Sequence, residues 1–272
     1  MRVIIFGTHS PDWMTALQPG ATVWAQVPGV EEVFHADTID AELPAPAANL
    51  RTVIIPLLED HIASCPTAYK SLTPSKQALL ILGNKAEFAA YARANGLAHL
   101  CPETYANPDT AVYPCMIKRV DLNCGVGVRL VHSKNELRAC QEQEPWRGHS
   151  HLLQAYVGGD RQSATHCICK DGRIVWHCAY VYEPADSNTV CNRGRRIHRT
   201  TEPASRLAEF ESFLAPLSYS GPCNVDYKIS ADDDRTMIME INPRFGGSLM
   251  RPDNLSDLVA ALSWILTLSA GL

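Results

Sequence analysis

Short apolar runs separated by turn residues fill the first 70 residues of the chain. The runs long enough to predict buried strands are Arg2–Phe6, Thr22–Val27 and Thr52–Leu58, and glycine and proline residues punctuate the stretches between them. This pattern indicates a small α/β unit. No Gly-x-Gly-x-x-Gly motif follows the first run, so a dinucleotide site is not predicted there.

A helical pattern follows from Ser75 to Asn95, where proline is absent and apolar residues recur at helical spacing. The Gly83-Asn84 pair in its middle predicts two successive helices, with Asn84 as the cap of the second. The Asn95-Gly96 pair is expected to end the second helix, because glycine accepts the left-handed conformation of a helix terminator.

From Pro114 to Ile238 the pattern changes to strands, and the Lys170-Asp171-Gly172 turn predicts a hairpin between two of them. Helices interrupt these strands, and a last helix follows with Ser256 as its N-cap. The predicted fold class is therefore α+β, with an α/β start. The predicted strands are Cys115–Lys118, Gly127–His132, His151–Val157, Ser163–Cys169, Arg173–Tyr182, Cys223–Ile229 and Thr236–Ile241, and the predicted helices are Ser133–Gln143, Pro203–Leu217 and Ser256–Leu268.

Composition narrows the class of protein. Apolar residues make up 46% of the 272 residues and charged residues 19%, which excludes a disordered chain. The net charge of −5 disfavours non-specific nucleic-acid binding, which needs a concentrated basic face. The apolar run at Leu258–Leu268 is too short to span a bilayer, and the first residues lack the features of a signal peptide. We therefore expect no nucleic-acid partner, no membrane partner and a cytoplasmic location.

The ten cysteines contain no Cys-x-x-Cys pair, whereas zinc sites usually draw on ligands two to four residues apart. The nearest approach is His166-Cys167-x-Cys169, whose alternation places both cysteines on one face of a strand. Reduced, buried cysteines in the core are the simpler expectation, because a free thiol behaves as a small hydrophobe.

Two lysines and a glycine-containing loop are candidates for phosphate binding. Lys85 begins a predicted helix, and Lys118 ends a strand that runs into the loop with Gly125 and Gly127. A lysine beside exposed backbone N–H groups suits a polyphosphate. A solvated lysine at the helix start and a plain hairpin turn after the strand are the alternatives.

A predicted strand with the residues Gln154, Ala155, Tyr156 and Val157 runs into the Gly158-Gly159 pair. Its backbone could offer donors and acceptors to the edge of a purine, and an inner strand with its turn is the alternative.

Acidic residues gather on two strands near the end of the chain. Asp226 and Lys228 share one strand face, as do Glu240 and Asn242, and the connecting Asp232-Asp233-Asp234 segment predicts antiparallel pairing. Two carboxylates and an amide oxygen would then converge, a set suited to Mg²⁺ that carries nucleotide phosphates. A surface ladder of ion pairs is the alternative.

Together these segments resemble the ATP-grasp superfamily, whose members include biotin carboxylase, carbamoyl-phosphate synthase and D-alanine–D-alanine ligase. The Glu-Ile-Asn-Pro-Arg stretch at residues 240–244 is the most specific element, and the other segments follow the order of the family. The resemblance covers Ser75 to the C-terminus. It implies an ATP-grasp domain over residues 75–272, with a lid subdomain at approximately 113–156, preceded by a small Rossmann-like α/β domain over residues 1–74.

The resemblance also implies roles for single residues. Gln154 stands where the family usually has glutamate, and Asp160 lies one place before the usual position of a ribose-binding acid, which Arg161 occupies. The implied ATP-binding residues are Lys85, Lys118, Gly125, Gly127, Gln154, Ala155, Tyr156, Val157 and Asp160; the implied ligands of Mg²⁺, or of Mn²⁺ in its place, are Asp226, Glu240 and Asn242; and the implied catalytic residues are Lys118 and Arg244.

The function implied is an ATP- and Mg²⁺-dependent ligase that activates a carboxylate as an acyl-phosphate for attack by an amine or another nucleophile. A phosphotransferase of the same fold and a non-catalytic nucleotide-binding regulatory module are the alternatives. The expected partners are the small-molecule carboxylate and nucleophile, and a homodimer is an option.

Four arginines occur within seven residues at Arg193–Arg199, the densest positive patch of an acidic chain. We expect Arg193 and Arg196 to contact the phosphates or an anionic carboxylate substrate from a loop over the active site, since guanidinium groups match these oxygens. A solvated loop and an RNA-binding patch are the alternatives, although no aromatic residues interleave the arginines.

Overall fold

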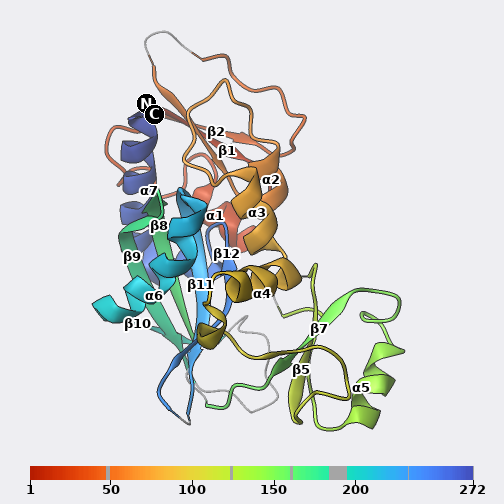
Figure 1. Ribbon diagram of the computed structural model, residues 1–272. Coiled ribbons are helices and arrows are strands. Elements are labelled where there is room, and N and C mark those ends of the chain that lie inside the picture. The colour runs from red at the N-terminus through yellow and green to blue at the C-terminus, as the bar shows by residue number, and fades with distance from the viewer. Residues whose placement is uncertain (47–49, 123–124, 160–161, 184–194, 232, 272) are drawn as a thin grey trace.

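The computed structural model describes residues 1–46, 50–122, 125–159, 162–183, 195–231 and 233–271. Within these residues the chain forms three β-sheets with helices packed around them (Figure 1). Four short 3-10 segments connect the larger elements: η1 (Ala98–Leu100), η2 (Ala215–Leu217), η3 (Gly247–Met250) and η4 (Pro252–Asn254).

The first sheet is parallel, in the order β2 (Glu32–Ala36), β1 (Arg2–Phe6), β3 (Thr52–Pro56). Helices α1 (Pro11–Leu17) and α2 (Glu59–Ala63) follow β1 and β3 along the chain. The α/β character predicted for this part of the chain is present in the structure.

The strand predicted at Thr22–Val27 is wrong, because these residues form successive turns. Val23, Trp24 and Val27 are buried at the spacing of a turn rather than in alternation, and the Val27 amide donates to the Val23 carbonyl. The apolar side chains of this run therefore pack into the core although its backbone is not an extended strand. Strand β2 lies later in the chain, and it was missed because Glu32 and His35 leave it without a continuous apolar run.

The second sheet is antiparallel, in the order β10 (Ile197–Thr200), β9 (Arg173–Tyr182), β8 (Gln162–Lys170), β11 (Gly221–Ile229), β12 (Thr236–Asn242). The predicted hairpin between β8 and β9 is confirmed: Asp171 and Gly172 have φ of 50° and 81°, the left-handed values that such a turn requires. The predicted strands between residues 115 and 241 are all present within two residues of their expected ends, and β10 is an additional strand.

The two faces of this sheet belong to different cores. Along β8, Cys167 and Cys169 face a core that contains α3 (Lys76–Gly83), α4 (Lys85–Ala94) and α6 (Ala204–Leu214). Ile168 points to the opposite face, into a core shared with the first sheet. The alternation of side chains along a strand explains why this almost continuously buried strand contributes to both cores.

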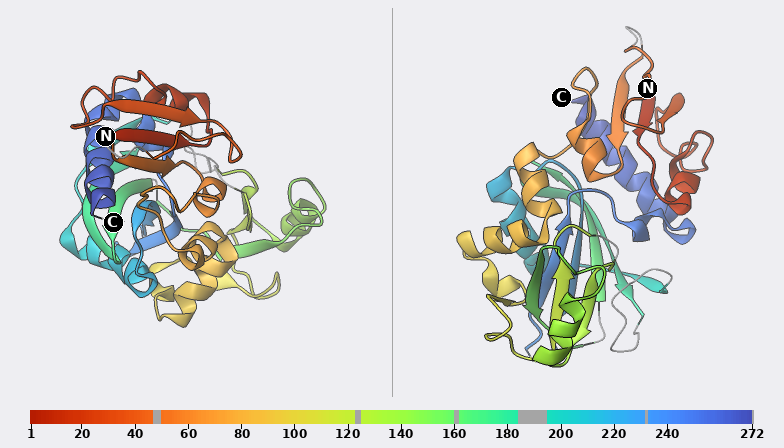
Figure 2. Two further views of the ribbon diagram at one scale, coloured as in Figure 1. Left: turned by 90° about the horizontal axis from the view of Figure 1, so that it is seen from above. Right: turned by 90° about the vertical axis from the view of Figure 1, so that its right-hand side faces the viewer.

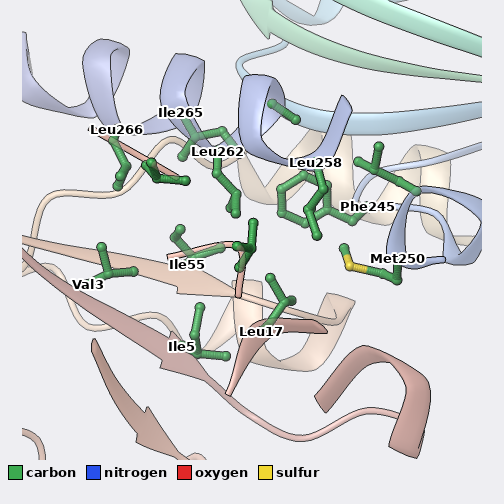
Figure 3. Close-up of a cluster of buried hydrophobic side chains, with 14 of the residues drawn as sticks. Val3, Ile5, Leu17, Ile55, Phe245, Met250, Leu258, Leu262, Ile265 and Leu266 are labelled. Atoms are coloured by element: carbon green, nitrogen blue, oxygen red, sulfur yellow. The ribbon is translucent and has the colours of Figure 1, made fainter. Parts of the chain in front are cut away.

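Helix α7 (Leu255–Ala270) packs between the first sheet and the second, which brings the end of the chain against its beginning (Figure 3). Leu258, Leu262 and Ile265 face Val3 and Ile55 in this cluster, and burial of each such side chain contributes about 1.5–3 kcal/mol. Since the first sheet shares this core with α7, the domain boundary expected between residues 74 and 75 stays a prediction.

The predicted start of this last helix at Ser256 is wrong. The helix begins at Leu255 with Asn254 as its N-cap residue, and the Asn254 side chain donates to the Ser248 carbonyl at 2.7 Å instead of capping the helix. The split after Gly83 is confirmed, since the Asn84 side chain accepts hydrogen bonds from the amides of Ala86 and Glu87.

The third sheet is antiparallel, in the order β4 (Thr104–Tyr105), β7 (His151–Ala155), β5 (Cys115–Arg119), β6 (Val128–Val131). Helix α5 (Lys134–Gln141) packs on it around Leu137 and Cys140, and the unit projects from the side of the molecule (Figure 2). This sheet lies in the region expected to form a lid, an assignment that stays a prediction.

The eight cysteines that the structure describes are free thiols, and all except Cys65 are buried, as expected of reduced core residues. Among the described residues, no helix is long and apolar enough to cross a membrane.

Candidate active site

A cavity of about 660 Å³ opens where the three sheets meet. Its walls come from β5 and β6 of the third sheet, from β11 and β12 of the second, and from the segments that follow β1 and β3 of the first. Elements far apart in the sequence therefore share one chamber.

One part of the cavity is apolar. Met116 of β5, Leu130 of β6 and Met239 of β12 line it, together with Val128 and Val157. Such a surface suits a flat aromatic ring. Polar backbone groups beside this surface would then confer specificity for one kind of ring.

The predicted hinge residues divide into two pairs. Tyr156 and Val157 line the cavity, whereas Gln154 and Ala155 do not. The buried Gln154 side chain donates to the Thr104 hydroxyl at 3.4 Å, and the Ala155 amide donates to the Glu103 carbonyl at 2.8 Å. The strand register thus leaves only the second pair to contact a ligand.

Three lysines enter the same cavity from three elements: Lys85 from the start of α4, Lys118 from β5 and Lys228 from β11. The Lys85 ammonium donates to the Leu122 carbonyl at 2.5 Å and lies 3.6 Å from Glu240 Oε2. The Lys228 ammonium lies 3.3 Å from the Val157 carbonyl oxygen. Three cations so close together create a region that attracts a polyanion.

Lys118 is the most buried of the three, with 6% of its surface exposed. Burial lowers its pKa to about 8; the negative charge of Glu240 opposes this effect, and the positive charges of Lys85 and Lys228 add to it. A phosphate group beside Lys118 would restore the ordinary preference for the charged form. Lys228 was not singled out as a site residue from the sequence, although its face on the strand was predicted correctly.

The acidic residues converge through the pairing of β11 with β12, in which Asp226 lies opposite Glu240 and Asn224 opposite Asn242. Asp226 Oδ2 accepts hydrogen bonds from Asn224 Nδ2 at 2.9 Å and from Asn242 Nδ2 at 3.0 Å. Asn242 Nδ2 also lies 3.2 Å from Glu240 Oε1. The amide of Asn242 thus bridges the two carboxylates.

The packing around Asp226 disfavours its negative charge. Burial, together with the negative charge of Glu240, raises its pKa to about 7. The described residues contain no cluster of three or more His, Cys, Asp or Glu side chains that could hold a metal alone. Two carboxylates held together in this way fit Mg²⁺, provided that phosphate oxygens complete its coordination.

Arg244 follows β12 and lies almost fully buried at the cavity wall. Its Nε donates to Glu59 Oε1 of α2 at 3.0 Å, and its Nη1 donates to the Phe245 carbonyl at 3.0 Å. The guanidinium is therefore oriented by a carboxylate from the N-terminal part of the chain.

The turn after Arg244 approaches the second sheet closely. A Cβ atom at Gly246 would lie 2.5 Å from His166 Cε1 and 2.6 Å from Asn224 Cγ, so only glycine fits this position. His166 is buried, its Nε2 lies 2.7 Å from the Ser248 hydroxyl, and burial lowers its pKa to about 3. A neutral histidine thus supports Ser248, which lines the cavity.

The N-terminal segments contribute lining residues that sequence reasoning missed, and no motif in the sequence marks them. They follow the ends of β1 and β3, where parallel strands direct their connections to one edge of the sheet. Arg251 and Tyr182 were also missed. The missed lining residues include His9, Ser10, Asp12, Trp13, Leu58, Tyr182, Ser248 and Arg251.

The remaining predicted site residues are placed as follows. Gly125 lines the cavity, whereas Gly127 is buried where a Cβ atom would lie 2.6 Å from the Arg119 side chain. Arg196 is exposed just before β10 and does not line the cavity. Asp160 and Arg193 lie outside the described residues.

A family model described as an ATP-grasp domain matches residues 83–248, more than half of the chain. The fold and the site thus define an ATP-grasp architecture of the α+β class. The chain belongs to the ATP-grasp domain family.

Solved structures support the same fold. D-alanine–D-alanine ligase from Bacillus anthracis, also solved as a complex with ATP, superposes with a TM-score of 0.66 at 16% identity over 100% of this chain and 96% of that chain. L-amino acid ligase from Bacillus licheniformis gives 0.65 at 13% identity over 97% and 72%.

The biotin carboxylase domain of Hydrogenobacter thermophilus 2-oxoglutarate carboxylase, in a complex with MgADP and bicarbonate, gives a TM-score of 0.66 at 13% identity over 99% of this chain and 64% of that chain. At such low identities these likenesses establish the fold alone. A comparison with curated protein sequences found no match.

Proposed function

We propose that this protein is an ATP- and Mg²⁺-dependent ligase that converts a carboxylate into an acyl-phosphate and transfers the acyl group to an amine or another nucleophile. The observation that carries the proposal is the convergence of Lys85, Lys118 and Lys228 with the Asp226–Glu240 pair in one cavity. The lysines can bind phosphate groups and the carboxylates can bind Mg²⁺, and both sets line the same cavity.

The nucleotide would lie along the cavity. Its base would pack between Met116, Leu130 and Met239, and the backbone of Tyr156 and Val157 would contact the edge of the base. The phosphates would lie among the lysines, with the Gly125 loop beside them. Asp160 is proposed as the ribose contact from its place in the sequence.

Asp226, Glu240 and Asn242 would hold the metal, with Asn242 contributing its amide oxygen after reorientation. Bound Mg²⁺ supplies charge neutralisation for the phosphate oxygens. Lys118 then keeps the γ-phosphate in place, and Arg244 stabilises the negative charge on the phosphoryl group as it moves.

The reaction has two steps. A carboxylate oxygen attacks the γ-phosphorus of ATP, and the bond to the bridging oxygen of ADP breaks. The nucleophile then attacks the acyl carbon, inorganic phosphate leaves, and the amine loses its proton. Substrates of this kind, a carboxylate and a nucleophile, are the partners that we propose.

A phosphate-release assay tests the proposal. Purified protein with ATP and Mg²⁺ is measured without addition, with a mixture of amino acids, and with each amino acid alone. Release that requires two co-substrates supports the ligase. Dependence on one co-substrate supports a phosphotransferase, and tight ATP binding without release supports a regulatory module.

The arginine-rich segment provides a second test of the same function. Arg196 and Arg193 are proposed to contact an anionic substrate when the segment lies over the cavity, whereas Arg251 already lines the cavity. Arg251→Ala is therefore expected to raise the KM for the carboxylate more than Arg196→Ala does. Equal kinetics of Arg196→Ala, Arg193→Ala and the wild type would leave these two arginines as solvated residues.

A further inference from the structure

His9 enters the cavity from the loop after β1 with its ring held in place. The ring stacks on the Trp13 indole, with centroids 3.9 Å apart and planes inclined by 6°. Trp13 is 2% exposed and belongs to the core around α7, so the backing of the imidazole is rigid. The orientation of the ring is therefore set before any ligand binds.

The hydrogen bonds of His9 determine where its proton lies. The Ser10 backbone amide donates to Nδ1 at 2.6 Å, and the Ser10 hydroxyl lies 2.8 Å from the same nitrogen. A backbone N–H can only donate, so Nδ1 accepts, and the proton of a neutral ring must lie on Nε2. Among the residues that the structure describes, none hydrogen-bonds Nε2.

Among the described residues, four charged or titratable groups act electrostatically on His9. Arg244 after β12 and His61 of α2 disfavour its protonation, whereas Asp12 of α1 and Glu59 of α2 favour it. Burial is the largest effect, and with Arg244 and His61 it outweighs the two carboxylates, so the pKa of His9 lies below its ordinary value. The imidazole is neutral at pH 7.

We propose that His9 is a catalytic residue that donates a hydrogen bond from Nε2 to an oxygen of the carboxylate substrate beside Arg244. This inference rests on the proposed ligase function, in which the carboxylate attacks the γ-phosphorus and Arg244 stabilises the transferred phosphoryl group. A neutral donor adds no positive charge that would repel Arg244. It can also stabilise the oxygen that becomes negative when the nucleophile adds to the acyl carbon.

The same geometry excludes His9 as the base that takes the proton of the amine. In the neutral ring only Nδ1 has a lone pair able to take a proton, and this lone pair already accepts the hydrogen bond from the Ser10 amide. The imidazole therefore contributes a donor and not a proton acceptor.

Two substitutions separate the hydrogen-bond donor of His9 from the stacking of its ring on Trp13. His9→Phe keeps a ring against Trp13 and removes both nitrogens, whereas His9→Gln loses the ring and keeps an N–H near the position of Nε2. His132→Phe, at an exposed position away from the cavity, is the matched control. We expect His9→Phe to lower kcat by about tenfold or more with an ATP Kd within about twofold of wild type, and His9→Gln to recover most of the loss.

The kinetic assay is the phosphate release described above, with the amino acid mixture as the probe, and the Kd for ATP comes from calorimetry. A His9→Phe enzyme with at least half of the wild-type kcat would overturn the role of His9 while leaving the ligase function intact. Equal losses in both variants would also overturn it, because the N–H kept by His9→Gln would then fail to restore activity. A wild-type protein that binds ATP but releases no phosphate with any carboxylate would instead contradict the proposed function, and the role of His9 with it.

The tautomer gives a readout that does not depend on turnover. In protein labelled with ¹⁵N-histidine, long-range proton–nitrogen spectra at pH 7 should show His9 neutral with its proton on Nε2, and the His9→Phe spectrum identifies its signals. A proton on Nδ1, or a charged ring, would overturn the proposal whatever the kinetics show.

Discussion

Arg244 and Glu59 are 185 residues apart in the chain, yet Arg244 Nε donates to Glu59 Oε1 at 3.0 Å. The contact joins the loop after β12 to the first turn of α2. Arg244 is 9% exposed and Glu59 24%, so the ion pair is only partly screened by water. The N-terminal part of the chain thereby orients the arginine that we assign to phosphoryl transfer.

Glu59→Gln should weaken this orientation. A neutral amide leaves the guanidinium without its carboxylate partner, and we expect kcat to fall about tenfold with a smaller change in KM for ATP, because Arg244 acts mainly on the transferred group. Asp60→Asn is the matched control, since Asp60 is the exposed neighbour of Glu59 on the same helix. Identical steady-state kinetics of the Gln variant and the control would show that Glu59 does not position Arg244.

Glu240→Gln should retain the fold and lose nearly all turnover. The substitution keeps the shape of the side chain but removes a carboxylate proposed to bind Mg²⁺, and we expect kcat to decrease about 100-fold or more. The measurement is phosphate release across a magnesium titration, with Glu87→Gln on α4 as an exposed control. Near wild-type activity at saturating magnesium would show that the metal site is wrongly assigned.

Lys118→Met should weaken ATP binding. The methionine keeps an apolar stem of similar length and deletes the charge, so the loss should be about 1–3 kcal/mol, as for a charged hydrogen bond. Calorimetry gives the Kd, and Lys76→Met at the exposed start of α3 is the control. Unchanged affinity would mean that Lys118 does not contact phosphate.

The affinity for ATP should also fall as the pH rises above about 8, the pKa to which burial lowers Lys118. Below this pH the lysine is already charged and binding needs no proton. Above it the free protein has a neutral lysine, and a bound phosphate must draw in a proton, which costs up to about tenfold in affinity per pH unit.

Kd values between pH 7 and pH 9.5 measure this dependence, and proton uptake appears as a buffer-dependent binding enthalpy. Lys118→Met should remove the part of the dependence that belongs to this residue. A wild-type Kd that stays constant over the range would contradict the assigned protonation change.

Local features of the fold were predictable because their causes lie within a few residues. The Asn84 side chain accepts hydrogen bonds from the backbone amides two and three residues after it. The break between α3 and α4 is therefore determined by four consecutive residues. The Asp171-Gly172 turn is equally local. The Glu-Ile-Asn-Pro-Arg stretch follows the same logic, since alternation along β12 places Glu240 and Asn242 on one face.

Errors arose where the local pattern was ambiguous. An apolar run such as Thr22–Val27 can extend or turn, and here packing of Trp24 against the core selected the turn. Ser256 resembled a cap, but the helix begins at Leu255, one residue before it.

The sequence by itself determined most strands of the two antiparallel sheets, the helix break and most of the residues that we propose bind phosphate and magnesium. Only the tertiary structure decided which of them meet. His9, Glu59 and Arg251 carry no local signal, because their chemistry depends on groups up to 242 residues away, brought together by the core that α7 shares with the first sheet. Burial, which raises the pKa of Asp226 and lowers that of Lys118, is likewise a property of the packed chain and of no segment alone.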